Sequence, residues 1–367
     1  MLFKKQKNYT SLSLSSMAWI RFKKNRLGTG ALVFILLFTL IAALGYLITP
    51  DPTPYANDQY LELGLKKPGF SVMMVPVKKQ VENLRSGWFQ TMLYGQVSSS
   101  RYIPVRSCIT IGPRLYYMEY GSQPGNPYQA GWIMNLPENQ PIKRNFLMGT
   151  DRFGRDYLSQ LMIGTRVSLS VGFISVAISL LLGILIGSLG GFYRGRTDHF
   201  VMWLINVVWS IPTLLLVIAI TFALGKGFWQ VFVAVGLTMW VEVARVVRGQ
   251  ILSIREKEFV EAARALGYSD FRIIFHHILP NVMAAVIVIS AANFASAILL
   301  EAGLSFLGLG VQPPVPSWGS MIKENYGYIV LDYAYLALLP GLAIMLMVLA
   351  FMLVGNALRD ALDVRTS

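Results

Sequence analysis

Side chains that could bind a metal or carry out acid–base chemistry are few in this sequence. Of 367 residues, three are histidine and one, Cys108, is cysteine. His276 and His277 are adjacent, and adjacent residues of a helix point about 100° apart, so the two rings make a poor metal-binding pair. A single thiol forms no internal disulfide, and one thiol with three imidazoles is too few ligands for a structural zinc site. We therefore expect no metal and no disulfide.

Phosphate chemistry is not expected on this chain either. Gly225 and Lys226 are the only pair that could end a phosphate-binding loop, but Ile220 stands where the loop needs glycine and Gly227 where it needs serine or threonine. Residues 51–145 contain no histidine, and their glutamates show no pairing that sequence can establish. We expect a chain that is not an enzyme, with no catalytic residue and no cofactor of its own.

Residues 250–280 carry two amphipathic patterns instead. The first has apolar residues at helical spacing: Phe259, Ala262, Ala263 and Leu266. It predicts a short helix with one apolar stripe, which Gly267 ends in the left-handed conformation. A second short helix is predicted, capped by Ser269 or Asp270, from the repeat of Phe271, Ile274, Phe275 and Ile278. Pro280 then opens a longer helix. Amphipathicity alone fits equally well a helix that lies on lipid.

The elements that must position this segment are long apolar helices. Apolar residues make up 54% of the chain and charged residues 14%, and the mean hydropathy is +0.51. These values exclude an ordinary soluble protein and indicate an all-α polytopic membrane protein. Crossing about 30 Å of hydrocarbon takes about 20 residues. Six stretches qualify: 27–50, 167–192, 200–224, 227–244, 278–300 and 333–358. The fourth contains Glu242, which we expect to pair with Arg245 one helical turn away.

The net charge of +13 would suggest nucleic acid as a partner of a soluble protein, but here it is explained by short basic loops. Residues 1–26 carry several lysines and arginines and no acid, so we expect this end in the cytoplasm. Alternation then places residues 245–272 and the tail, 359–367, in the cytoplasm and residues 51–145 outside. A cleaved signal peptide is the alternative for the first span, whose uninterrupted apolar length exceeds that of a signal peptide.

Residues 51–145 are long for a connection between two spans. Three β-prone runs separated by Pro and Gly predict a small β-rich extracytoplasmic insert: 70–77, 102–111 and 115–120. A poorly ordered loop is the alternative, but disordered segments are poor in aromatic residues and this one is rich in them. We expect the insert to contact a binding protein, a partner permease or lipid headgroups.

Two segments resemble a known family. Residues that are similar to the E-A-A-x-x-x-G loop of ABC importer permeases, and to the Leu-Pro pair beyond it, are Glu261, Ala262, Ala263, Gly267, Leu279 and Pro280. His277, before that pair, is typical of the peptide-transport branch. The G-T-D-x-x-G-R-D segment of the C-type permease of dipeptide, oligopeptide and nickel importers is matched by Gly149, Thr150, Asp151, Gly154, Arg155 and Asp156. The resemblance covers residues 21–50 and 145–365, so nothing transfers from it to most of the insert.

The resemblance implies a type I ABC importer permease (MetI-like) fold with six transmembrane helices, in which residues 146–358 form the permease core. It implies a subunit of the bacterial inner membrane that pairs with a homologous permease, so that peptides or similar solutes pass between the two. Two separate ATPases would bind ATP and Mg, and an extracytoplasmic binding protein would deliver the substrate. The residues expected to couple transport to the ATPases are Phe259, Glu261, Ala262, Ala263, Leu266, Gly267, Leu279 and Pro280.

Two alternatives remain open at this point. One is a permease of the same family for nickel or another non-peptide solute. The other is a secondary transporter, which would be expected to place ionisable residues near mid-span and to show repeated halves.

Within the second span, Gly183 and Gly187 form a G-x-x-x-G pattern that Gly190 extends. Such a stripe lets another helix approach closely, from the same chain or from a second subunit.

Overall fold

The computed structural model describes residues 14–78, 87–112, 114–122, 130–134, 140–225 and 227–362. Its long helices are α2 (Arg26–Ile48), α4 (Tyr157–Tyr193), α7 (Phe228–Ile254), α10 (Leu279–Leu307) and α12 (Tyr335–Leu362). The shorter helices are α1 (Leu14–Lys24), α3 (Trp88–Tyr94), α5 (Gly195–Trp209), α6 (Thr213–Leu224), α8 (Glu258–Ala265), α9 (Asp270–Arg272) and α11 (Trp318–Asn325). A π-helical turn, η4 (Ile273–Ile278), joins α9 to α10.

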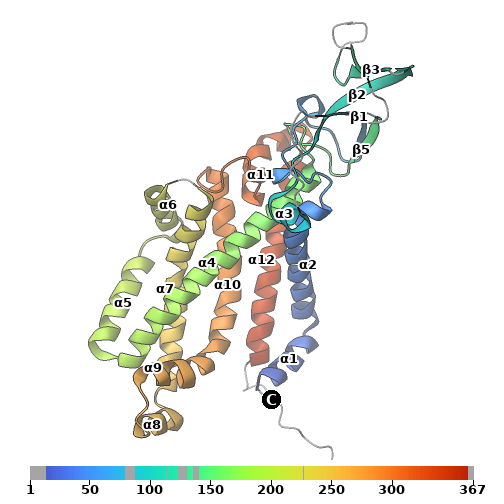
Figure 1. Ribbon diagram of the computed structural model, residues 1–367. Helices are drawn as coiled ribbons and strands as arrows, with labels where there is room; N and C mark the ends of the chain where they lie inside the picture. Colours follow the sequence, from blue (N-terminus) through green and yellow to red (C-terminus); the bar gives the residue numbers. More distant parts are fainter. Residues whose placement is uncertain are drawn as a thin grey trace, which may run out of the picture. The chain divides into compact units, whose positions relative to one another are not determined.

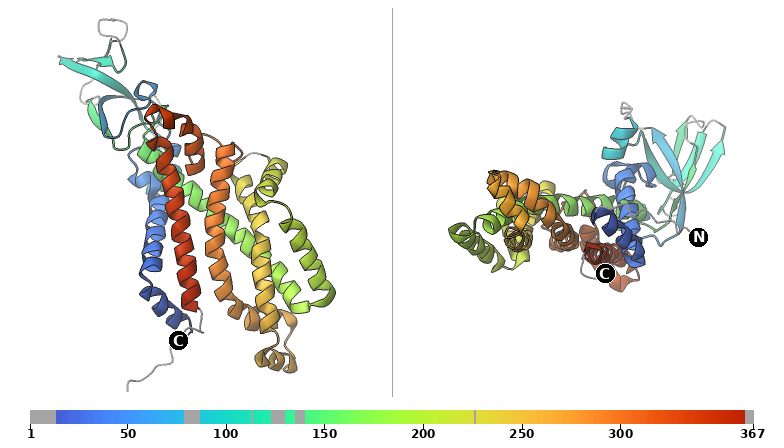
Figure 2. Two further views of the ribbon diagram at one scale, coloured as in Figure 1. Left: turned by 180° about the vertical axis from the view of Figure 1, so that it is seen from behind. Right: turned by 90° about the horizontal axis from the view of Figure 1, so that it is seen from below.

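The chain forms two compact units. Unit 1 comprises Met1–Leu37, Ser170–Leu304 and Ile344–Ser367, and unit 2 comprises Phe38–Leu169 and Ser305–Ala343. In unit 1, α7 lies between α5 and α10 (Figures 1 and 2). Buried valines and isoleucines of α7 pack against both neighbours, because each of these helices turns an apolar stripe toward the others.

Unit 2 contains an antiparallel sheet of five strands in the order β4-β3-β2-β1-β5. The strands are β1 (Phe70–Lys78), β2 (Ser100–Ile111), β3 (Arg114–Glu119), β4 (Ala130–Met134) and β5 (Ile142–Phe146). β1, β2 and β3 lie on the three β-prone runs of the sequence. Met74 of β1 and Phe146 of β5 are fully buried in one cluster with Leu63, so apolar residues on one face of the sheet supply this small core.

Five described helices are long and apolar enough to span a membrane, and a sixth span is possible only if α5 and α6 count as one. The apolar stretch predicted as one span over 200–224 is divided between two helices, because α5 and α6 meet at 90°. Pro212 explains the break, since proline has no backbone N–H and its ring clashes with the preceding helical turn.

The predicted separation of the second amphipathic helix from the next span is also wrong. Residues Asp270–Leu307 form one continuous helical element through α9, η4 and α10. The turn before Pro280 is π-helical, and this wider turn accommodates the proline without ending the helix. Neither Ser269 nor any other side chain caps the start of α9.

Candidate functional site

Helix α8 ends in a Schellman motif. The N–H of Gly267 donates to the carbonyl of Arg264 at 2.9 Å, and the N–H of Tyr268 donates to the carbonyl of Ala263 at 3.2 Å. Gly267 has φ +76°, and a Cβ placed on it would meet no atom within 4 Å. Glycine is therefore favoured here by backbone conformation and not by lack of space.

The two faces of α8 have different surroundings. Val260 and Ala263 are buried in a cluster with residues of α7 and α10. Phe259 is 40% exposed and Leu266 71% exposed, and Glu261 and Ala262 are exposed beside them. The predicted single stripe is therefore divided, because Ala263 packs inward. Val260 is the anchor that the sequence pattern missed, although its spacing of three from Ala263 indicates a second apolar face.

The second amphipathic segment is divided in the same way. Ile274 and Ile278 are buried in the cluster that holds α8, whereas Phe271 and Phe275 are exposed with their ring centroids 4.4 Å apart. Leu279 is buried and Pro280 is exposed. Unit 1 therefore presents exposed apolar side chains from α8 and from α9–η4, and a continuous core ties both to α7 and α10.

The ring of His277 stacks on Tyr268, with centroids 5.7 Å apart and planes within 9°. The guanidinium of Arg272 also lies over the ring of Tyr268, 4.3 Å from its centroid. This stacking gives His277 a packing role at the turn after α8. Among the described residues, no group of three or more His, Cys, Asp or Glu side chains could hold a metal ion.

The glycines of the small-residue stripe face helices of the same chain. A Cβ on Gly183 would lie 2.4 Å from the Cβ of Val243, and one on Gly187 would lie 2.5 Å from the carbonyl oxygen of Ala244. A Cβ on Gly190 would lie 3.0 Å from a side-chain carbon of Val201. The stripe therefore serves close packing of α4 on α7 and α5.

Beside the bend between α5 and α6 lies a cavity of about 290 Å³ whose wall includes Glu242, Trp209, Thr213, Thr238 and Ser296. Glu242 is exposed, and in the described part of the chain it makes no ion pair. The predicted pairing with Arg245 is wrong. Arg245 instead lies over the ring of Trp209, 3.6 Å from its centroid. This cation–π contact stabilises the guanidinium.

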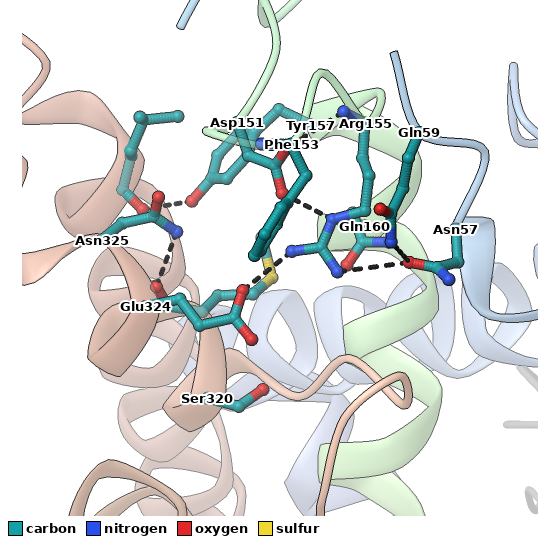
Figure 3. A network of polar contacts seen from close by, with 12 residues as sticks. Asn57, Gln59, Asp151, Phe153, Arg155, Tyr157, Gln160, Ser320, Glu324 and Asn325 are labelled. Atoms are coloured by element: carbon teal, nitrogen blue, oxygen red, sulfur yellow. Dashed lines mark hydrogen bonds and ion pairs between the residues drawn. The ribbon is translucent and has the colours of Figure 1, made fainter. Parts of the chain in front are cut away.

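In unit 2, the segment from Gly149 to Asp156 folds into a tight loop before α4. Asp151 Oδ1 accepts the backbone N–H groups of Phe153 and Arg155, both at 2.9 Å. Arg155 Nε donates to Asp151 Oδ2 at 2.6 Å, and Arg155 Nη2 donates to Glu324 Oε2 of α11 at 2.8 Å. Figure 3 shows Arg155 between these two carboxylates.

Two close approaches explain the glycines of this loop. A Cβ on Gly154 would lie 1.7 Å from the carbonyl oxygen of Tyr60, and one on Gly149 would lie 2.2 Å from that of Lys66. Asp156 is buried at the start of α4, where its Oδ1 accepts the Ser159 N–H at 2.7 Å. Burial raises the pKa of Asp156 above its ordinary 3.8. The loop is a buried scaffold, and it brings no pair of free catalytic groups together.

Residues 161–367 match the model of a family described as binding-protein-dependent transport system inner membrane component. The chain belongs to this family. Residues 13–68 also match the N-terminal transmembrane domain of oligopeptide transport permease C. The permease is therefore a subunit of an ATP-driven importer and a multi-pass protein of the bacterial inner membrane, and its role is transport.

Two relatives illustrate the similarity of this permease to known proteins. It is 38% identical to the glutathione transport system permease protein GsiD of Pectobacterium atrosepticum over 67% of this chain and 77% of the relative. It is 44% identical to the di/tripeptide transport system permease protein DppC of Pseudomonas aeruginosa over 59% of this chain and 72% of the relative. A solved structure of the MetNI methionine ABC transporter aligns at 20% identity with a TM-score of 0.47, over 56% of this chain and 96% of that chain.

Proposed function

We propose that this permease imports peptides, together with a homologous permease, two ATPases and an extracytoplasmic binding protein. The observation that carries the coupling role is the division of α8 into two faces. Val260 and Ala263 fix the helix to the core of unit 1, while Phe259, Ala262 and Leu266 are exposed on it. A helix that is apolar outward and firmly anchored inward can dock in a groove and transmit displacement to the spans.

We propose one membrane topology for this permease. Both chain ends and α8 lie in the cytoplasm, and the sheet of unit 2 lies outside. The core has the type I permease fold, and α5 with α6 forms a broken sixth span. ATP and Mg are bound by the separate ATPases, to which Glu261 offers a charge for an arginine or lysine. This orientation is supported by basic residues at the span ends placed in the cytoplasm: Arg21, Lys23, Lys24, Arg26, Arg194, Arg196, Arg248 and Arg359.

Peptides are the proposed substrates because the named relatives transport glutathione and di- or tripeptides. The path runs past the cavity at the α5–α6 bend, where Glu242 is an exposed carboxylate in an apolar span. A carboxylate facing lipid at the centre of a helix costs about 3 kcal/mol, so a water-filled path or a partner surface is the better environment. The second candidate, a nickel or other non-peptide permease, is favoured by no contact in the described residues.

The coupling role is tested by Phe259→Ser with Leu266→Ser, which removes apolar area only from the exposed face of α8. The matched control is Ile109→Ser, at an apolar residue of β2 that is 65% exposed. We expect the double variant to insert and pair normally but to lose co-purification with the ATPases and substrate-stimulated ATP hydrolysis. Normal ATPase capture by the double variant would exclude this surface as the docking site.

The substrate class is tested separately in proteoliposomes that contain the complete complex. Uptake of labelled di- and tripeptides is compared with uptake of nickel, each with the binding protein present. Peptide uptake that depends on ATP supports the proposal. Nickel uptake without peptide uptake would replace the substrate class and leave the coupling role intact.

A further inference from the structure

Four backbone carbonyls converge on one arginine in unit 2. Arg166 of α4 donates from Nε to the carbonyl of Ala42 at 2.9 Å and from Nη2 to that of Ala43 at 3.0 Å, both in α2. It also donates to the carbonyls of Met92 and Leu93 in α3, at 2.7 and 3.0 Å. Because a guanidinium carries five donors in a rigid plane, this side chain fastens the last turn of α3 to α2.

A second attachment holds the residues after α3. The N–H of Gln96 donates to the carbonyl of Pro52 at 2.8 Å, just beyond the end of α2. Gly95 has φ +80°, and a Cβ there would lie 2.9 Å from the same carbonyl oxygen. Two separate contacts therefore fix α3 beside the final turns of α2.

The contacts of α3 with α2 show how far along the membrane span α3 lies. With 1.5 Å of rise per residue, Ala42 and Ala43 lie about 8 Å before Ile48, the last residue of the apolar span. The hydrogen bonds to Arg166 therefore bring α3 alongside the outermost part of α2 (Figure 1). That part of α2 exposes Leu40, Leu47 and Ile48, which is the surface a span presents to lipid.

Helix α3 itself buries none of its residues. Trp88 is 71% exposed, Phe89 57% and Tyr94 70%, and the sequence of the helix, WFQTMLY, contains no charge. Exposed aromatic residues without charge are unfavourable in water, but tryptophan and tyrosine are enriched where a bilayer meets water. Arg166 requires no carboxylate at this depth, because four carbonyls accept its donors.

We propose that α3 is an interfacial membrane helix whose aromatic side chains lie among the lipid headgroups and upper acyl chains, at the end of α2. The partner is the bilayer, because α3 is exposed, aromatic and uncharged and is held through Arg166 beside the outer turns of an apolar span. Since α3 lies between β1 and β2 in the chain, this contact restrains the base of the sheet at the membrane surface. The family matches do not supply this role, because α3 lies outside both matched ranges.

The test measures the depth of single nitroxide labels on the full chain in nanodiscs, with and without its partner subunits. Cys108→Ser provides a background free of cysteine, into which Phe89→Cys, Tyr94→Cys or the control Ile109→Cys is introduced. Electron paramagnetic resonance then compares the access of oxygen, which concentrates in lipid, with that of a water-soluble nickel chelate. We expect labels at 89 and 94 to favour oxygen several-fold over the nickel chelate, and the label at 109 to favour the chelate.

Two outcomes would overturn the proposal. Labels at 89 and 94 that resemble the label at 109 would place α3 in water. Labels shielded from both reagents would mean that a protein surface covers the helix. A further variant, Arg166→Lys, keeps the positive charge but lacks the planar fork, so it should raise nickel access at 89 and 94 while leaving 109 unchanged. No change at 89 and 94 would show that Arg166 does not position α3.

Discussion

Arg155 and Glu324 are joined by a hydrogen-bonded ion pair of 2.8 Å between residues 169 positions apart in the chain. The arginine is nearly buried and also bonds Asp151, so one cation serves two carboxylates. The pair links the loop before α4 to α11, and both elements belong to unit 2. Such a contact is sensitive to the loss of either partner, because a carboxylate left buried without its cation is costly.

Replacing Arg155 with alanine is expected to destabilise unit 2 by about 3 to 5 kcal/mol, since Asp151 and Glu324 both lose their cation. Arg155→Lys should cost less, because a point charge can still serve one carboxylate. Thermal unfolding of the purified complex measures both. A double-mutant cycle with Glu324→Ala isolates the pair. Lys67→Ala, which breaks an exposed ion pair with Asp332, is the control and should change nothing measurable.

The left-handed Gly267 gives a second prediction. Gly267→Ala should cost about 1 kcal/mol and Gly267→Val more, whereas Gly267→Asn should be tolerated, because asparagine enters the left-handed region more readily. Capture of the ATPases should weaken in the same order. Gly249→Ala is the control, since Gly249 is helical and a Cβ there meets no atom within 4 Å. Normal ATPase capture and transport by Gly267→Val would contradict the proposed coupling role of this turn.

Glu242→Gln keeps the size of the side chain and removes its charge. If the carboxylate meets a cationic group of the substrate in the path, uptake should fall about tenfold, corresponding to the loss of one charged hydrogen bond. Assembly with the ATPases should be unchanged. Glu62→Gln, an exposed glutamate of unit 2, controls for the loss of one charge. Unchanged uptake at limiting peptide concentration would remove Glu242 from the path.

The buried Asp156 predicts that the stability of the folded chain depends on pH. Its pKa is raised in the folded chain because burial disfavours the carboxylate. Its contribution to stability is therefore fully present below the unfolded pKa and is lost as the pH rises through the folded pKa. Asp156→Asn, which can still accept from Ser159, should gain stability relative to the natural chain over that interval. Unfolding midpoints from about pH 4 to pH 7 measure this difference. The exposed Asp270→Asn controls for the charge, and parallel curves would contradict the prediction.

Much of this protein is determined by local sequence. Uninterrupted apolar stretches predict the long helices, since a chain that crosses lipid must satisfy its own backbone hydrogen bonds, as a helix does. The runs at 70–77 and 102–111 predict β1 and β2 through their β-prone residues and flanking breakers. Gly267 predicts the left-handed turn because few other residues adopt it without strain. The family, too, is predicted from short segments whose residue types and spacing are specific.

Only the tertiary structure decided which side chains meet. Periodicity placed Ala263 with Phe259 and Leu266, but packing on α7 and α10 turned Ala263 and Val260 inward. Arg245 was expected to bond Glu242 by helical spacing, and it stacks on Trp209 because α5 brings that ring within 3.6 Å. The contacts of Arg155 and Arg166 join segments far apart in the chain, and such pairings depend on chain path. Local propensity carries no information about them, because their free energy is gained only when distant elements pack together.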